Sequence, residues 1–393
     1  MGIRKPIFLI DGGQSIQVVT DTLVKFINGA KRSLHIAIFD FRLGDPATVR
    51  RITGALKAKA AAGVDVKIAY DHRNAPKFGP GDDPAPHGTH VFLHGHFAGT
   101  SVKLQPVGWT EVHFEGIAGS KLMHNKYVIR DGHSVDAAVL MGSANFTDDA
   151  WTHQENNILI LESAALSAFY ETDFQELWAG GKVAGTGVND FGKVTRDGLN
   201  LDVAFSPGEG RRIDHEIANL ILDARESIHI ASMVITSDAI LQALSQVLRA
   251  GRVTVRGIFD GPEMHSSKSQ MRSAVKIAEI DLLEKHFIAK HSTPYDTKHP
   301  EGLHDFMHNK TIVVDDALIT GSHNFSHSAE HNAENALLIR DPALAKAYRD
   351  YIGKLVTKYS VEDLVTTRGR RSVKSTMSLT ASGGKGGAKT RKA

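Results

Sequence analysis

Two short segments of the chain each carry a histidine followed two residues later by a lysine. The first pair is His124 and Lys126, and the second is His308 and Lys310. Alternate residues of a β-strand share a face, so each histidine should project beside its lysine. An imidazole can attack an electrophile or transfer a proton, and a lysine ammonium group can hold an anionic oxygen. Each pair therefore supplies half of a site for a tetrahedral anion.

A turn of small residues follows each pair and adds further polar groups. It contains Ser143 and Asn145 in the first copy, and Ser322 and Asn324 in the second. If the two copies face each other, their imidazoles, ammonium groups and amides surround one point. Such a set suits a phosphate that passes through a five-coordinate, negatively charged transition state. One histidine can be the nucleophile, while the other protonates the leaving oxygen and then activates water or an alcohol.

A nucleophilic imidazole needs an acceptor for its second ring nitrogen, because that contact fixes the tautomer and stabilises the imidazolium. Glu155 and Glu334, which occupy matching segments, are the predicted acceptors. The alternative is that each glutamate only ends a turn before a strand. Asp131 and Asp315 lie an odd number of residues beyond their histidines. An odd offset faces away from the histidine in a regular strand, so we expect structural roles for both aspartates.

Helices that alternate with strands must position these residues. Apolar spacing predicts helices at 15–29 and 46–63, and strands at 33–41 and 64–70. The same order returns after residue 199. It comprises predicted strands at 200–205, 227–235 and 252–259, and predicted helices at 213–221 and 237–251. This alternation predicts the α/β class, with mixed, largely parallel sheets flanked by helices.

The repeated order extends to the residues themselves, since 30–37 (AKRSLHIA) match 224–231 (ARESIHIA). Two long copies predict two similar lobes related by a pseudo-twofold axis. We place the N-terminal lobe at 1–190, the C-terminal lobe at 191–366 and a basic, disordered tail at 367–393.

Two long stretches without clear periodicity, 72–119 and 261–305, hold equivalent places before the two histidines. Connections of this length in a compact domain are usually functional. We expect them to wall the site and to select the substrate.

Composition bounds the class of protein. The chain has 393 residues, is 41% hydrophobic and has no cysteine, which excludes disulfides and thiol nucleophiles. It has no apolar run long enough to cross a membrane and no secretory signal, so we expect a cytoplasmic protein. Eight of the basic residues, and no acidic ones, lie between 368 and 393. That tail either improves solubility or contacts a polyanion such as an anionic membrane or a nucleic acid.

The doubled pattern H-x-K-x4-D with G-S-x-N downstream resembles the phospholipase D superfamily over residues 5–360. The resemblance implies a two-step displacement through a phosphohistidine, without metal or other cofactor. It implies that His124 is the nucleophile and His308 the general acid and base. It also makes Asp131 and Asp315 part of the catalytic signature. The groups expected to hold phosphate oxygens are Lys126, Lys310, Asn145 and Asn324, with the hydroxyls of Ser143 and Ser322.

The substrate class is less sharply indicated than the reaction. Two copies in one chain, with long unlike inserts, resemble the lipid-acting members, and the acidic body disfavours a nucleic-acid groove. We therefore expect a phospholipid substrate and a monomer. Residues 321–326 followed by Ala-Glu resemble the small bacterial nucleases instead, so cleavage of DNA or RNA is the alternative. An inactive module that binds phosphate groups is a third hypothesis.

Overall fold

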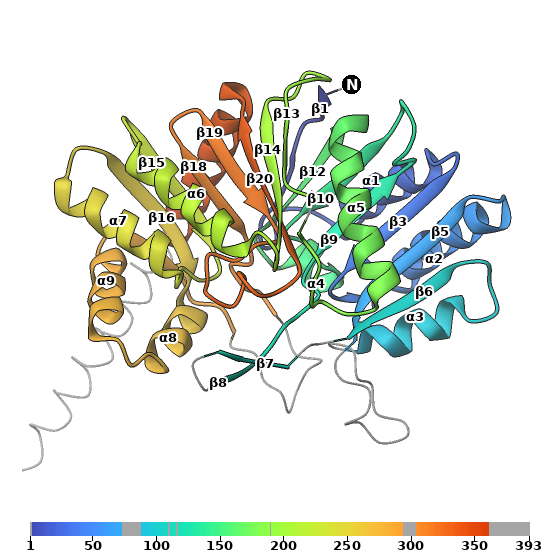
Figure 1. Cartoon of the computed structure of the whole chain (residues 1–393), viewed down its shortest axis with the longest axis horizontal. Helices are drawn as coiled ribbons and strands as arrows, with labels where there is room; N and C mark the ends of the chain where they lie inside the picture. Colours follow the sequence, from blue (N-terminus) through green and yellow to red (C-terminus); the bar gives the residue numbers. More distant parts are fainter. Residues whose placement is uncertain are drawn as a thin grey trace, which may run out of the picture.

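The computed structural model describes residues 2–72, 88–108, 111–114, 117–188, 190–293 and 304–360. These residues form two eight-stranded sheets, one in each half of the chain, and two short two-stranded sheets (Figure 1). The tail predicted at 367–393 lies outside the described residues.

The first sheet has the strand order β1-β12-β10-β9-β3-β5-β6, and β2 also pairs with β12. Its strands are β1 (Gly2–Ile3), β2 (Ile7–Leu9), β3 (Ser33–Ile38), β5 (Asp65–His72), β6 (Lys103–Gly108), β9 (Lys126–Arg130), β10 (Ala138–Gly142) and β12 (Asn156–Glu162). The same half of the chain has two short pairs: β4 (Phe41–Arg42) with β11 (Phe146–Thr147), and β7 (Glu111–Phe114) with β8 (Ile117–Ser120). The helices of this half are α1 (Ile16–Asn28), α2 (Pro46–Ala61), α3 (Thr89–Phe97), α4 (Asp148–Thr152) and α5 (Ala164–Gly180).

The second sheet has the order β13-β14-β20-β19-β18-β15-β16-β17. Its strands are β13 (Gly192–Val194), β14 (Leu201–Ser206), β15 (Ser227–Ser232), β16 (Thr254–Asp260), β17 (Phe287–Lys290), β18 (Lys310–Val314), β19 (Ala317–Gly321) and β20 (Glu334–Arg340). Its helices are α6 (Gly210–Leu222), α7 (Asp238–Ala250), α8 (Gly261–Ser269), α9 (Ala274–Glu284) and a helix over residues 342–360. From β12 to β6 and from β20 to β17 the two orders correspond strand for strand.

The α/β class with mixed sheets flanked by helices is confirmed, but the expected excess of parallel pairing is wrong. Within the described strands, each large sheet has only two parallel pairs: β3-β5 and β5-β6, and β15-β16 and β16-β17. The strand that carries each lysine returns through a short turn, and a short turn can only join antiparallel neighbours. The hairpins β9-β10 and β18-β19 are therefore antiparallel.

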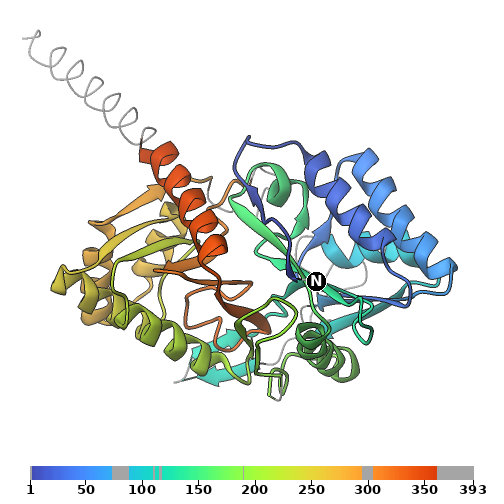
Figure 2. The same ribbon diagram turned by 90° about the horizontal axis from the view of Figure 1, so that it is seen from above.

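The two sheets enclose a shared apolar core. Side chains of α5 and of the helix at 342–360 pack there with residues from both sheets, and Figure 2 shows that last helix against the second lobe. Helices α1, α2 and α3 cover the outer face of the first sheet, and α6, α7 and α9 that of the second. Burial on both faces explains why the strands read as nearly continuous apolar runs.

The stretches at 72–119 and 261–305, expected as irregular walls, contain regular elements in their described parts. These elements are α3, β6, β7 and β8 in the first stretch, and α8, α9 and β17 in the second. The helices escaped sequence analysis because their apolar residues do not gather on one clear stripe.

Candidate active site

His124 and His308 meet where the two lobes join, although 184 positions separate them in the sequence. Their ring centroids are 6.5 Å apart, and each residue is 6% exposed. Each histidine stands two residues before the start of its strand, β9 or β18. Both line a cavity of about 450 Å³ that also receives Asn145 and Asn324. The predicted convergence of the two copies is present.

Glu334 holds His124 from the opposite lobe. Its Oε2 lies 2.8 Å from His124 Nδ1, and Glu334 is fully buried. Burial alone would raise the pKa of Glu334, but His124 and Lys126 offset it and leave that pKa below its ordinary value. An ionised carboxylate therefore accepts the Nδ1 proton, which directs the lone pair of Nε2 away from Glu334 and leaves it available for attack.

His308 has a different partner from the one expected. Its Nδ1 lies 3.1 Å from Oδ1 of Asn156, not near Glu155. Asn156 Nδ2 donates to Ala150 O, and Ser143 Oγ donates to Asn156 Oδ1 at 2.7 Å. This network assigns the amide oxygen to the histidine side. His308 is therefore oriented by a neutral acceptor.

Strand register explains why Asn156, and not the predicted Glu155, contacts His308. Gly142 pairs with Ile158 and Gly321 with Ala336, so Asn156 is the equivalent of Glu334. The connection after the asparagine turn is one residue longer in the first lobe. Matching the two segments by their Glu-Asn letters therefore shifted the alignment by one position.

Glu155 instead joins the two lobes away from the histidines. Its Oε2 lies 2.6 Å from the Nζ of Lys290, and Tyr359 donates its hydroxyl hydrogen to Oε1. Glu155 is fully buried and Lys290 is 2% exposed. Glu155 therefore forms an ion pair between the lobes and does not contact either histidine in the predicted way.

The two lysines are buried beside their histidines. Lys126 Nζ and Lys310 Nζ each donate to the carbonyl oxygen of their own histidine at 2.7 Å. Burial lowers the pKa of Lys126 to about 7, although Glu334 and Asp40 oppose that shift. Burial and the neighbouring Lys126 hold the pKa of Lys310 well below its ordinary value. An anionic phosphate near both ammonium groups would relieve their repulsion.

Burial also lowers the pKa of both histidines. That of His124 falls to about 4, with Glu334 opposing the shift and Lys126 adding to it. That of His308 lies well below its ordinary value through burial and through Lys310 and Lys126. Both imidazoles are therefore neutral near pH 7, the form in which a histidine can attack.

In the small-residue turns, the serines make structural hydrogen bonds and the asparagines face the cavity. Ser143 Oγ accepts from Asn157 N, and Ser322 Oγ accepts from Asn335 N at 3.0 Å. These serines brace the turns, so the expectation that they bind phosphate is not supported by their contacts. The Oδ1 atoms of Asn145 and Asn324 are buried without a hydrogen-bond partner among the described residues. The two asparagines therefore have unused polar groups in the cavity.

Asp131 and Asp315 stand at the far ends of β9 and β18. Asp131 accepts the backbone N–H groups of Lys31, Arg32 and Ser33, and Asp315 accepts those of Arg225, Glu226 and Ser227. Each aspartate lies five positions beyond its lysine, about 16 Å at roughly 3.3 Å per residue. The residue-based expectation of a structural role agrees with this geometry, and the signature's catalytic role does not.

Several residues around the cavity were missed by the sequence analysis. They include Phe39, Asp40, Arg42, Asp149, Met233, Glu263, His304 and Phe306. Burial raises the pKa of Asp40 to about 7, and its carboxylate lies 3.4 Å from Arg42 Nε. Asp40 lies near the end of the strand predicted at 33–41, and Arg42 directly follows it, so these two residues had a local signal.

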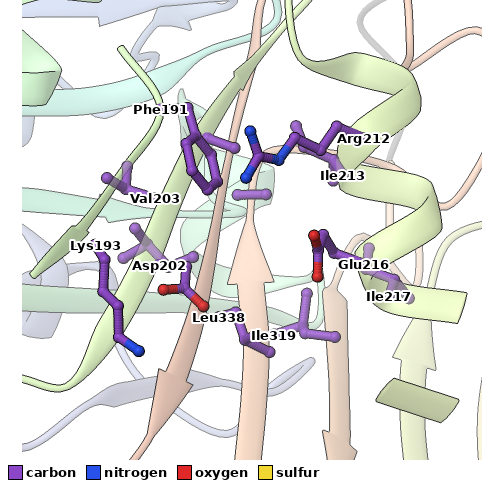
Figure 3. Close-up of a pocket in the computed structure, with 13 residues that line it drawn as sticks. Phe191, Lys193, Asp202, Val203, Arg212, Ile213, Glu216, Ile217, Ile319 and Leu338 are labelled. Atoms are coloured by element: carbon purple, nitrogen blue, oxygen red, sulfur yellow. The ribbon is translucent and has the colours of Figure 1, made fainter. Parts of the chain in front are cut away.

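A second cavity of about 310 Å³ lies between α6 and strands β13, β14 and β20 at one end of the second sheet (Figure 3). Its wall is mostly apolar, and the Arg212 guanidinium lies 3.3 Å from the Phe191 ring centroid. None of the paired histidines or lysines lines it. It is separate from the candidate active site.

The family model "Cardiolipin synthase, PLD-like domain" matches residues 23–178 and 217–356. The chain belongs to the phospholipase D-like family. The two matched segments contain both histidine–lysine pairs of this phospholipase D-like protein.

Individual relatives agree with that assignment. The phospholipase D of Rickettsia conorii is 32% identical over 150 residues, which are 38% of this chain and 65% of that protein. The match therefore spans just under two thirds of that relative's length. The phosphatidylserine synthase of Haemophilus influenzae Rd KW20 superposes with a TM-score of 0.58 at 15% identity, covering 95% of this chain and 96% of that one.

The polyphosphate kinase of Porphyromonas gingivalis gives a TM-score of 0.54 at 10% identity, covering 89% of this chain and 47% of that one. Both structural likenesses concern the fold. Among the described residues, no helix of the phospholipase D-like chain is long and apolar enough to cross a membrane.

Proposed function

We propose that the chain is a phospholipase D-like phosphodiesterase that acts on phospholipids through a covalent phosphohistidine. The observation that carries the reaction is the meeting of His124 and His308 within one cavity, with an ammonium group beside each. The family model that matches this chain is described as a cardiolipin synthase domain, and the relative from Rickettsia conorii is a phospholipase D. Both likenesses support a phospholipid substrate.

The unequal partners of the histidines support an order of events. His124 Nε2 attacks phosphorus, and the Nδ1 proton stays hydrogen-bonded to Glu334, whose charge stabilises the imidazolium that forms. His308 gives its proton to the departing alkoxide. It then takes a proton from water or an alcohol, which attacks the phosphohistidine and releases His124.

Protonation of His308 for the first step depends on the substrate. Lys310 and Lys126 both lower the pKa of His308. A phosphodiester anion bound between the lysines and asparagines offsets these positive charges and raises the histidine pKa toward its ordinary value. Substrate binding thereby favours the protonated form of His308, which is the form that acts as general acid.

A burst experiment with bis(p-nitrophenyl)phosphate tests the assignment. Because p-nitrophenolate leaves without protonation, His308→Ala should release one equivalent of nitrophenol rapidly and then turn over slowly. His124→Ala should show no burst, because the nucleophile is missing. The reverse pattern would exchange the two roles, and wild-type turnover in both variants would reject the shared site.

Substrate class needs a separate comparison. Phosphatidylglycerol and phosphatidylcholine vesicles should be assayed beside single- and double-stranded DNA and RNA, with and without a primary alcohol. The proposal predicts release of the head group, or its exchange for the alcohol. Cleavage of nucleic acid without lipid turnover would establish the nuclease alternative. Anion binding without turnover of any diester would establish the inactive module.

A further inference from the structure

A second cluster of titratable side chains lies outside the active-site cavity, on the turn between β19 and β20. His327, Glu330 and His331 each offer one ligand atom, and these atoms all lie within 4.8 Å of one another. His327 Nδ1 is 3.5 Å from Glu330 Oε1. The imidazole ring centroids of His327 and His331 are 5.1 Å apart. In the part of the chain that the structure describes, no other three imidazole or carboxylate groups come this close.

The shortest of these distances suits a small transition-metal ion. Zinc bonds of about 2.0–2.2 Å to nitrogen and oxygen place tetrahedral ligand atoms about 3.3–3.6 Å apart. The contact between His327 and Glu330 already has that length. His331 follows His327 by four residues on a turn whose N–H groups at His331 and Asn332 both bond to Ser328 O, so the two imidazoles share one side.

The backbone of this turn is braced from both lobes. A Cβ at Gly210, the first residue of α6, would lie 2.0 Å from Glu330 O, so helix and turn are in close contact. Ala333 N donates to Leu122 O at 2.8 Å, and Leu122 N donates to Asn332 Oδ1 at 2.9 Å. A ligand set on a braced turn loses little conformational entropy when it binds an ion.

The charges around the turn are mixed. Asp214 on α6 is 2% exposed, and its carboxylate, which lies 2.9 Å from His323 Nε2, repels the nearby carboxylate of Glu330. A divalent cation would offset that repulsion. The opposing cations are Lys121 and Arg211, and the guanidinium of Arg211 lies 4.0 Å from Glu330 on a side chain that is 72% exposed and can turn away.

We propose that His327, Glu330 and His331 form a binding site for a divalent transition-metal ion such as Zn²⁺. Two imidazoles and one carboxylate leave a fourth position for water. The same donors disfavour Mg²⁺ and Ca²⁺, which prefer a shell of oxygen ligands. This site is separate from the phosphodiester reaction, which needs none of its three residues.

Calorimetric titration of the full, tag-free chain after dialysis against a chelator tests the site. Zn²⁺ should bind with one equivalent in the wild type and should raise its melting temperature, whereas Mg²⁺ should do neither. His327→Ala and His331→Ala should each abolish both effects. The His327 side chain is about half exposed, at 48%, so its variant should keep the metal-free melting temperature.

Two further variants make the result decisive. Arg211→Gln removes the nearest cation and should tighten Zn²⁺ binding. The matched control is His90→Ala with His94→Ala, since this pair on α3 has the same four-residue spacing but contacts the Tyr70 hydroxyl. Unchanged Zn²⁺ affinity in the His327 and His331 variants, or loss of binding only in the control, overturns the proposal.

Discussion

His124 and His308 hold equivalent positions, but their orienting partners differ in charge. Glu334 offers His124 a carboxylate, whereas Asn156 offers His308 an amide oxygen. A carboxylate stabilises the imidazolium that a nucleophilic histidine becomes, and a neutral acceptor only orients the ring. In the proposed mechanism this asymmetry distinguishes the nucleophile His124 from the general acid His308.

Glu334→Gln tests this difference at the residue scale. The substitution keeps an acceptor near His124 but removes the charge, so kcat should fall about 10²-fold or more. Glu155→Gln is the matched control, because it changes the same residue type in the segment that sequence alone equates with Glu334. It should leave kcat for a small diester within a few fold. Equal losses in both variants would contradict the assignment of partners.

The pH profile of kcat/KM should be bell-shaped. His124 must be neutral to attack, and burial lowers its pKa to about 4, so activity should fall as the pH drops through that value. Lys126 must be charged to hold phosphate, and its pKa is about 7, so activity should also fall as the pH rises through neutrality. A profile that stays flat from pH 6 to pH 9 would contradict the role of Lys126.

At the scale of elements, β9 and β18 each have a lysine of the candidate site at one end and a structural aspartate at the other. Each lysine begins its strand, and each aspartate lies just beyond the strand's end. Asp131 has a φ of 54° and Asp315 a φ of 48°, a left-handed turn that aspartate tolerates better than most residues. The aspartate carboxylate ties that turn to the start of β3 or β15 through three N–H groups.

Asp131→Ala should therefore destabilise the fold while sparing catalysis. Loss of charge-assisted hydrogen bonds should lower the free energy of unfolding by about 1.5–3 kcal/mol. Urea unfolding measures that change, and kcat for bis(p-nitrophenyl)phosphate at low temperature should stay near the wild-type value. Asp131→Asn, which keeps an acceptor oxygen, should recover part of the stability. Complete loss of kcat in a folded Asp131→Ala variant would restore the catalytic role.

At the scale of the whole molecule, reciprocal polar contacts join the lobes. Asn157 Nδ2 donates to Asn309 Oδ1, and Asn335 Nδ2 donates to Asn125 Oδ1. Tyr170 donates to Asn335 Oδ1, and Tyr348 to Asn157 Oδ1. Such exchange of equivalent contacts is what an approximate twofold axis produces. Asn125 and Asn309 are the middle residues of the two histidine–lysine segments, so the interface itself sets the position of the paired histidines and lysines.

The ion pair of Glu155 and Lys290 tests the strength of this interface. Lys290→Met leaves a buried carboxylate without its ammonium partner and should lower the free energy of unfolding by about 3–5 kcal/mol. Adding Glu155→Gln should restore part of the loss, because no uncompensated charge then remains. Denaturant unfolding of the single and double variants measures this coupling. Additive losses would show that the two residues act independently.

The doubled motif, the alternating helices and strands, and the convergence of two histidines were predictable from the sequence. They depend on local periodicity and on a repeat that survives in the residue types. Mixed rather than largely parallel sheets were not predictable from alternation alone, because pairing direction depends on which strands become neighbours. Residues such as Glu263 and His304 reach the cavity from elements with no local signal.

The sequence by itself determined the chemistry available: two imidazoles, two ammonium groups and two amides on matching segments. Only the tertiary structure decided which acceptor each histidine meets. Glu334 crosses to His124 and Asn156 crosses to His308, while Glu155 turns to Lys290. A single additional residue before β12 shifts the register by one, and in a strand one position reverses the direction of the side chain. Letters can be aligned in two ways there, but only one register pairs the strands.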